Sequence, residues 1–140
     1  CEKIMTADEN QVTPMHYHWK KMEDIINRGG GNLVVELYRG TEEGELTDDD
    51  VTVSIDGVEK TFKAGEKVYI KPGQSITLKP YVYHRFYGED GRGKVLIGEV
   101  STVNDDEHDN RFYDNVGRFP AIEEDEVPLH LLVSDYPKYL

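Results

Sequence analysis

Short β-rich runs, separated by turn signals at near-even spacing, are the feature that most constrains how this chain can fold. The runs contain many β-branched and aromatic residues, and helical periodicity is scarce between them. We expect strands at residues 2–6, 11–18, 32–39, 51–56, 60–63, 67–70, 75–79, 82–87 and 94–101. A series of about nine such strands predicts an all-β sandwich or barrel, with a jelly-roll β-barrel as the leading candidate.

The segments between these strands complete the expected layout. VTVSIDGVEKTF is the clearest hairpin, because its Asp56-Gly57 dipeptide suits a primed turn, and RGGGN at 28–32 also indicates a turn. The acidic run at 41–50 lacks the glycine-centred spacing of a calcium loop and is expected to be a solvated loop. Polar residues 104–128 are expected to wrap the barrel or cover its mouth before a last strand at 129–136. We expect a single domain over 1–140.

Charge and cysteine content limit the possible partners and compartment. The 28 acidic and 16 basic residues give a net charge of -12, which disfavours nucleic acid and anionic membrane surfaces and fits a neutral small molecule or a cation. No apolar run approaches the roughly 20 residues of a membrane span. The lone cysteine, Cys1, excludes an internal disulfide, and we expect a cytoplasmic location. A missing upstream segment is favoured over lipid attachment at Cys1, because no flexible tether follows it.

Three histidines and one glutamate form a candidate metal site. His16 and His18 are two residues apart, so both rings project from one face of a strand, and Glu23 follows closely. His84 lies on a later strand that a closed barrel can bring to the same place. Alone, the His-x-His pair also fits an exposed or structurally satisfied pair. Imidazole with carboxylate suits one divalent ion among Mn, Fe, Co, Zn and Ni, and excludes Cu(I) and iron–sulfur clusters.

This spacing resembles the first motif of the cupin superfamily. That motif is Gly, five residues, His-x-His, three or four residues, Glu, six residues and Gly. The chain has Asn10, His16, His18, Glu23 and Gly30 at the matching positions. Asn10 replaces the first Gly, and asparagine is among the residues that best tolerate a left-handed backbone.

The second cupin motif, Pro-x-Gly-x-x-His with a later Asn, is matched less closely. Pro80 stands four rather than five residues before His84, Val82 replaces the usual Gly, and Gly88 replaces Asn. The histidine itself falls where cupins place their last ligand. The resemblance therefore implies a cupin-type jelly-roll barrel with His84 as a metal ligand.

Three long segments resemble the D-lyxose ketol-isomerase family of bacterial cupins: MHYHWKKMEDIINRGGGNLVVELY, PGQSITLKPYVYHRFYGEDG and GEVSTVNDDEHDNRF. The resemblance implies conversion of D-lyxose to D-xylulose and of D-mannose to D-fructose. It also implies that one divalent ion, usually manganese, is bound by His16, His18, Glu23 and His84. Family chains generally carry more sequence before the equivalent of Cys1.

Aldose–ketose interconversion needs a base near the substrate and positive charge beside the enediolate oxygens. Glu99, a carboxylate in the apolar run VLIGEVS, is our candidate proton shuttle, although a buried structural acid fits equally well. Glu36 in NLVVELY is a similar misfit and a candidate substrate-binding residue. Lys21 could hold a substrate oxygen and assist catalysis, or be a solvated lysine. Asp109 could hold sugar hydroxyls or cap a turn.

Several aromatic side chains could form a wall for a sugar ring, although core packing is the simpler interpretation for each of them: Trp19, Tyr83, Phe86 and Tyr87. His108 and His130 are expected at the surface. Three functions stay open: a metal-dependent sugar isomerase, which we favour, an Fe(II) cupin oxygenase, and a non-enzymatic sugar- or metabolite-binding cupin. Exposed strand edges favour a homodimer.

Overall fold

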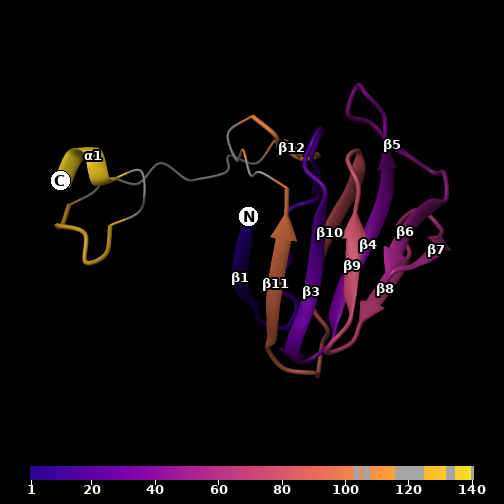
Figure 1. Ribbon diagram of the computed structural model, residues 1–140, viewed down its shortest axis with the longest axis horizontal. Helices are drawn as coiled ribbons and strands as arrows, with labels where there is room; N and C mark the ends of the chain where they lie inside the picture. Colours follow the sequence, from indigo (N-terminus) through magenta and orange to yellow (C-terminus); the bar gives the residue numbers. More distant parts are fainter. Residues whose placement is uncertain (103–104, 106–107, 116–124, 132–134, 140) are drawn as a thin grey trace.

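Two antiparallel sheets face each other in the computed structural model of the chain, which describes residues 1–102, 105, 108–115, 125–131 and 135–139 (Figure 1). The first sheet has the order β1 (Glu2–Ala7), β11 (Val95–Ser101), β3 (Glu23–Gly30), β9 (Ser75–Leu78), β6 (Val51–Ile55) and β7 (Val58–Phe62). The second has the order β12 (Arg111–Phe112), β2 (His16–Tyr17), β10 (Val82–Gly88), β4 (Leu33–Gly40) and β5 (Leu46–Thr47), and β8 (Lys67–Ile70) also pairs with β4. The all-β prediction is confirmed.

β3 is the main element that the sequence did not predict. Residues 28–30 were expected in a turn, yet β3 runs through them to Gly30, paired with β11 and with a register shift between Leu96 and Ile97. Gly30 has φ 87°, and a Cβ there would collide with the carbonyl oxygen of Lys94. Glycine therefore lets β3 continue into close contact with β11, because it accepts both the backbone conformation and the close approach.

Other boundaries also differ from expectation. The predicted strand at 11–18 is reduced to β2, and the acidic loop at 41–50 contains the short strand β5. The predicted strand at 129–136 is wrong where the chain is described, since residues 129 and 130 form a bend and the helix α1 (Tyr136–Tyr139) follows. Residues 132–134 lie outside the described residues, as does most of 116–128. No helix among the described residues is long and apolar enough to cross a membrane.

In the described part of the chain, three non-glycine residues take left-handed backbone angles at turns. The predicted hairpin is confirmed as β6–β7, with Asp56 at φ 50° and Gly57 at φ 81°. Asn10, in place of the first motif glycine, has φ 58°. In the second motif the left-handed residue is Tyr81, at φ 62°, and not Val82. The turn before β10 is therefore kept without glycine, at a strain of about 1–2 kcal/mol.

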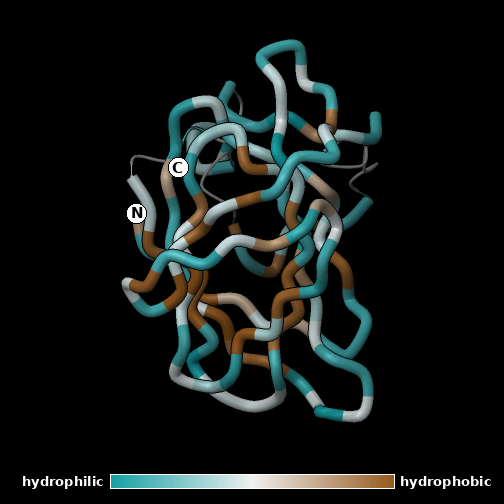
Figure 2. Tube along the Cα trace, turned by 90° about the vertical axis from the view of Figure 1, so that its right-hand side faces the viewer, coloured by the Kyte–Doolittle hydropathy of each residue, from teal (hydrophilic) through white to brown (hydrophobic). Residues whose placement is uncertain are grey.

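The barrel interior is apolar over most of its length and polar at one end. One core cluster joins both sheets: Ala7, Ile25, Leu33, Val35, Leu37, Val51, Val53, Ile55, Val68, Ile70, Ile76, Leu78, Phe86, Val95 and Ile97. In Figure 2 the hydrophobic stretches gather in the middle and lower part of the barrel. β11 runs upward and β3 downward in Figure 1, so Glu99 and Glu23 both lie at the upper end. This end holds the candidate site.

Candidate metal centre

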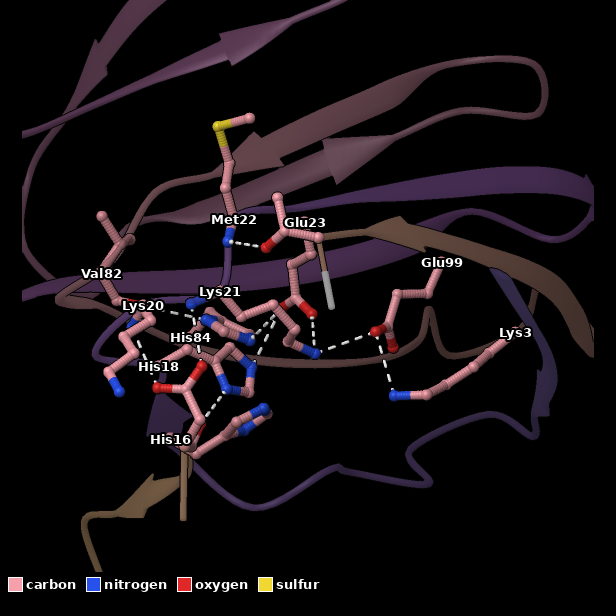
Figure 3. Close-up of polar contacts among 12 residues, drawn as sticks. Lys3, His16, His18, Lys20, Lys21, Met22, Glu23, Val82, His84 and Glu99 are labelled. Carbon is pink, nitrogen blue, oxygen red and sulfur yellow. Dashed lines mark hydrogen bonds and ion pairs between the residues drawn. The ribbon is translucent and has the colours of Figure 1, made fainter. Parts of the chain in front are cut away.

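The four predicted metal ligands converge at the polar end of the barrel (Figure 3). His84 on β10 lies directly opposite His16 on β2, while His18 follows β2 and Glu23 begins β3. One ligand atom from each residue lies within 4.8 Å of the others. His18, Glu23 and His84 are at most 4% exposed, and His16 is half-buried. Strands distant in sequence therefore build one ligand set.

Each of the three imidazole rings is oriented by a backbone carbonyl. The Nδ1 atoms of His16, His18 and His84 lie 2.8, 2.6 and 2.9 Å from the carbonyl oxygens of Pro14, Asp109 and Val82. A carbonyl oxygen can only accept a hydrogen bond, so each Nδ1 carries the hydrogen and donates it. The Nε2 atoms then carry the lone pairs, which is the tautomer that a metal ligand needs.

The buried Nε2 atoms fit a metal ion better than a hydrogen-bond network. Those of His18 and His84 are buried without a hydrogen-bond partner in the described structure, although Glu23 Oε1 is 3.5 and 2.9 Å away. Buried polar atoms are normally satisfied. A divalent cation between three imidazole nitrogens and one carboxylate would satisfy them, and this ligand set is typical of Mn, Fe, Co, Ni or Zn.

The charge state of the ligands suits the same ion. Burial lowers the pKa of His16, and repulsion by His84 adds to this effect, so the ring favours its neutral form. Burial would raise the pKa of Glu23, but its close contacts with the His18 and His84 rings lower it overall, well below its usual range. Neutral imidazoles and an ionised carboxylate are the forms that bind metals.

A chain of alternating charges extends from Glu23 along the inner wall of the barrel. Lys21 Nζ lies 2.6 Å from Glu23 Oε2 and 2.9 Å from Glu99 Oε1, and Lys3 Nζ lies 3.1 Å from the same Glu99 oxygen. Burial lowers the pKa of Lys21, but the Glu23 and Glu99 carboxylates raise it overall. Lys21 is 4% exposed. It is therefore a buried cation between a metal ligand and the candidate base, and not a solvated lysine.

Asp109 holds the turn that carries the ligands. Its carboxylate accepts hydrogen bonds from the backbone amides of Trp19, Lys20 and Lys21, each at 2.9 Å. Its carbonyl oxygen accepts the Nδ1 hydrogen of His18. These contacts are the ones expected if Asp109 caps a turn. Its contact with sugar hydroxyls stays a prediction.

Glu36 and Tyr87 lie on the opposite face of the second sheet from the metal ligands. Glu36 is paired with Arg85, while His84 is paired with Leu37, so the two side chains point to opposite sides. The Glu36 carboxylate accepts one hydrogen bond from Arg85 at 2.7 Å and another from the Tyr87 hydroxyl at 2.8 Å. Burial raises the pKa of Glu36, but the hydrogen bonds from Tyr87 and Arg85 lower it overall. The predicted sugar-binding roles of both residues find no support in this placement.

The expected aromatic wall is divided among three places. Phe86 belongs to the main core, Tyr83 and Trp19 belong to a second cluster around Tyr17 on the outer face, and Tyr87 lies beside Glu36. The aromatic ring beside the ligands is instead Phe112 on β12, 5.6 Å from the ring of His16. The sequence missed it because a two-residue strand carries no alternation. His108 and His130 are exposed, as predicted.

Solved structures place this fold among the cupin-type barrels. The chain superimposes on a dTDP sugar isomerase from Desulfovibrio desulfuricans G20 with a TM-score of 0.58 at 12% identity, covering 81% of this chain and 64% of that one. It superimposes on the L-ribose isomerase of Acinetobacter sp. DL28 with a TM-score of 0.58 at 18% identity, covering 82% and 59%. At such identities the likeness concerns the fold, and the predicted cupin-type barrel is confirmed.

Sequence comparison then gives the family. The family model described as D-lyxose isomerase matches residues 1–136, and the chain belongs to that family. It is 54% identical to a D-lyxose/D-mannose isomerase of Serratia proteamaculans over the whole chain and 61% of that protein. It is 50% identical to one of Escherichia coli O157:H7 over 99% of the chain and 61% of that protein. The chain thus spans about three-fifths of the length of these curated relatives.

Proposed function

We propose that this chain is the catalytic barrel of a metal-dependent aldose–ketose isomerase, formed by one cupin domain over residues 1–140. Its substrates are D-lyxose, converted to D-xylulose, and D-mannose, converted to D-fructose. One observation carries the proposal: three imidazole lone pairs and the Glu23 carboxylate converge beside the buried Lys21–Glu99 ion pair. Family membership and relatives of the same activity support this choice of sugar.

One divalent ion, with Mn(II) favoured over Co, Fe, Zn and Ni, would be held by His16, His18, Glu23 and His84. When bound, such an ion is a Lewis acid that polarises the substrate carbonyl and stabilises negative charge on its oxygens. With four protein ligands, such an ion would keep coordination positions for substrate oxygens. Neighbouring residues must then supply proton transfer and orientation.

Glu99 is the group proposed to move the proton. In the open-chain aldose its carboxylate would accept the proton on C2, which gives an enediolate, and would return a proton to C1. The hydroxyl proton moves from O2 to O1, so the ketose has the composition of the aldose and no co-reactant is needed. Glu99 is inward-facing and 6% exposed, on the strand that pairs with the beginning of β3.

Lys21 is proposed to bind the substrate oxygen that gains negative charge. An ammonium group has three N–H donors, and two of those of Lys21 are directed at Glu23 and Glu99. Among the described residues the third donor has no partner, and we propose that it binds a substrate oxygen between the metal ligands and the base. Asp109 acts through Lys21 and His18, because it fixes the backbone of the turn that carries both.

We also propose a homodimer in the cytoplasm. Ile4, Leu96 and Val100 are 70%, 42% and 42% exposed on the outer face of the edge pair β1–β11. An exposed apolar edge is stabilised by pairing or cover. The lone cysteine, Cys1, is exposed and needs no oxidising compartment. Light scattering at micromolar concentration should give twice the monomer mass, and a monomer mass would contradict the homodimer.

The deciding experiment is conversion of D-lyxose to D-xylulose by the metal-stripped protein, with and without added Mn(II) and in the strict absence of oxygen. We expect turnover only with the metal. Stoichiometric metal binding without turnover of D-lyxose or D-mannose would favour the binding-protein alternative, and a requirement for both Fe(II) and oxygen would favour an oxygenase. Equal turnover with and without the metal would contradict the proposed role of the site.

A further inference from the structure

Lys3 occupies an inward position on β1 where an apolar side chain is expected. Along this strand Lys3, Met5 and Ala7 share one face; Ala7 is part of the apolar core and Met5 packs against it. A lysine in this row must keep its charge paired, because an unpaired buried charge is strongly destabilising. Its side chain is 31% exposed, so the ammonium lies at the barrel mouth and not in the apolar core.

The pairing of β1 with β11 puts Lys3 directly opposite Glu99. Both lysines, Lys3 at 3.1 Å and Lys21 at 2.9 Å, donate to the same oxygen, Glu99 Oε1. Figure 3 shows them reaching this oxygen from different elements. Among the described residues Glu99 Oε2 accepts no hydrogen bond. Two charged donors on one oxygen thus fix the carboxylate and leave the other oxygen for the substrate.

The two lysines differ in what else they touch. Lys21 also binds the metal ligand Glu23, so its removal disturbs the metal site together with Glu99. Lys3 reaches Glu99 from the edge strand and has no ion pair with the described metal ligands. Glu99 is faced by Lys3 from β1, by Lys21 from the β2–β3 turn and, along β3, by apolar Ile25 and then Glu23. Lys3 therefore contacts Glu99 without pairing with a metal ligand, and its replacement leaves the Lys21–Glu23 ion pair in place.

We propose that Lys3 is a positioning residue of the isomerase, whose ammonium holds the Glu99 carboxylate turned toward the substrate. The edge strand β1 thereby becomes part of the active site, although it carries no metal ligand. This inference rests on the proposed function, in which Glu99 is the base.

The test compares Lys3→Met with Lys94→Met. Lys94 forms a 3.0 Å ion pair with Asp8 at the opposite end of the same β1–β11 pair, so its loss is a matched change in charge and edge contacts. Lys3→Met should keep its manganese content and its KM within about twofold. Its kcat should fall by roughly 10–100-fold, the usual effect of losing a supporting contact behind an active group. Lys3→Arg should restore most of the rate, and Lys94→Met should match the parent.

The split between kcat and KM separates positioning from mere stability. A purely structural role would lower the free energy of unfolding of Lys3→Met but leave the kcat of the folded, metal-loaded variant unchanged. Normal kcat in Lys3→Met, no rescue by Lys3→Arg, or an equal loss of rate in Lys94→Met would overturn the proposal. If the parent protein has no isomerase activity, the proposed function fails instead. The Lys3–Glu99 contact is then still measured by the free energies of unfolding of Lys3→Met, Glu99→Gln and the double variant, whose losses should not be additive.

Discussion

Glu99 and Glu36 are two buried carboxylates in otherwise apolar strands, each 6% exposed and each paired with a cation. Glu99 points into the barrel beside Lys21 and the metal ligands. Glu36 points outward, where Arg85 and Tyr87 occupy both of its oxygens. The contrast shows that burial of an acid does not by itself mark a functional residue. What each carboxylate faces, and whether an oxygen is left for a substrate, separates a candidate base from a structural ion pair.

The largest expected effect is on the metal itself. His84→Ala or His16→Ala should abolish stoichiometric metal binding and turnover, because each removes one of the three oriented Nε2 ligands. The barrel should stay folded in both variants, since the apolar core extends over both sheets away from this end. Elemental analysis and circular dichroism measure the two properties. Full metal content in both variants would refute the ligand assignment, and His108→Ala, at the exposed surface, is the matched control.

Glu99→Gln should have the next largest effect. The amide keeps the shape of the side chain but removes the basic oxygen, so kcat should fall by about two to four powers of ten. Metal and sugar should still bind, because the ligands are unchanged. Glu36→Gln, the matched change on the outer face, should keep kcat within about twofold. Near-normal turnover in Glu99→Gln would remove this residue from the mechanism.

Isotope labelling tests the same step independently. In deuterated water, proton transfer through the enediol should place solvent deuterium in the product, provided that the proton on Glu99 exchanges before it returns. A hydride shift would leave the product unlabelled. Deuterium in the product of the parent protein would therefore support proton transfer over a hydride shift, and the Glu99→Gln variant then tests which residue is the base.

Lys21→Met should differ from the histidine variants and from Glu99→Gln in its kinetic pattern. The variant removes a cation from between Glu23 and Glu99 and also the donor proposed to bind the substrate oxygen. We therefore expect KM to rise and kcat to fall, together lowering kcat/KM by about 10²–10³-fold. A change confined to kcat would contradict the substrate contact. Metal titration is the control, because two carboxylates left without their shared cation also alter the site.

Much of this arrangement was predictable from local sequence, and the misplaced residues show where such prediction ends. His16 and His18 share a face by spacing alone, and Glu99 shares one with Val95 and Ile97. Whether Glu36 lies on the face of His84 depends on the β4–β10 register, which pairs residues that are 49 apart in sequence for Glu36 and Arg85. Alternation within one strand does not give that register.

Lys3 and Asp109 illustrate the same limit. The side of the sheet on which Lys3 lies can be predicted from the alternation in EKIMTA. Its partner Glu99 cannot, because it depends on the pairing of β1 with β11, and the two residues are 96 apart in sequence. The backbone amides of Lys20 and Lys21, to which Asp109 binds, are 89 and 88 residues away in sequence. Interactions between residues so far apart in sequence form only in the folded barrel. The local sequence pattern therefore indicates which residues are unusual, but not which residues they contact.

The smallest effect is expected from loss of the ion pair between Glu36 and Arg85 on the outer face, and its effect on stability should depend on pH. Hydrogen bonds from Tyr87 and Arg85 hold the pKa of folded Glu36 below its ordinary value of 4.5. The ion pair therefore stabilises the fold fully above about pH 4.5, and this stabilisation is lost as the pH falls through the folded pKa. Glu36→Gln should lower the free energy of unfolding by about 1–2 kcal/mol at neutral pH. The difference from the parent should shrink in acid.

Urea unfolding of the metal-free parent and the variant, compared at each pH, measures this difference without the metal's own pH dependence. Because both proteins lose the same histidine and Glu23 contributions on acidification, the subtraction isolates Glu36. A difference that stays constant or grows as the pH falls would mean that the carboxylate of Glu36 is not ionised in the fold. The outer-face group would then be a neutral hydrogen-bonded acid, and its contrast with Glu99 would be one of charge as well as of placement.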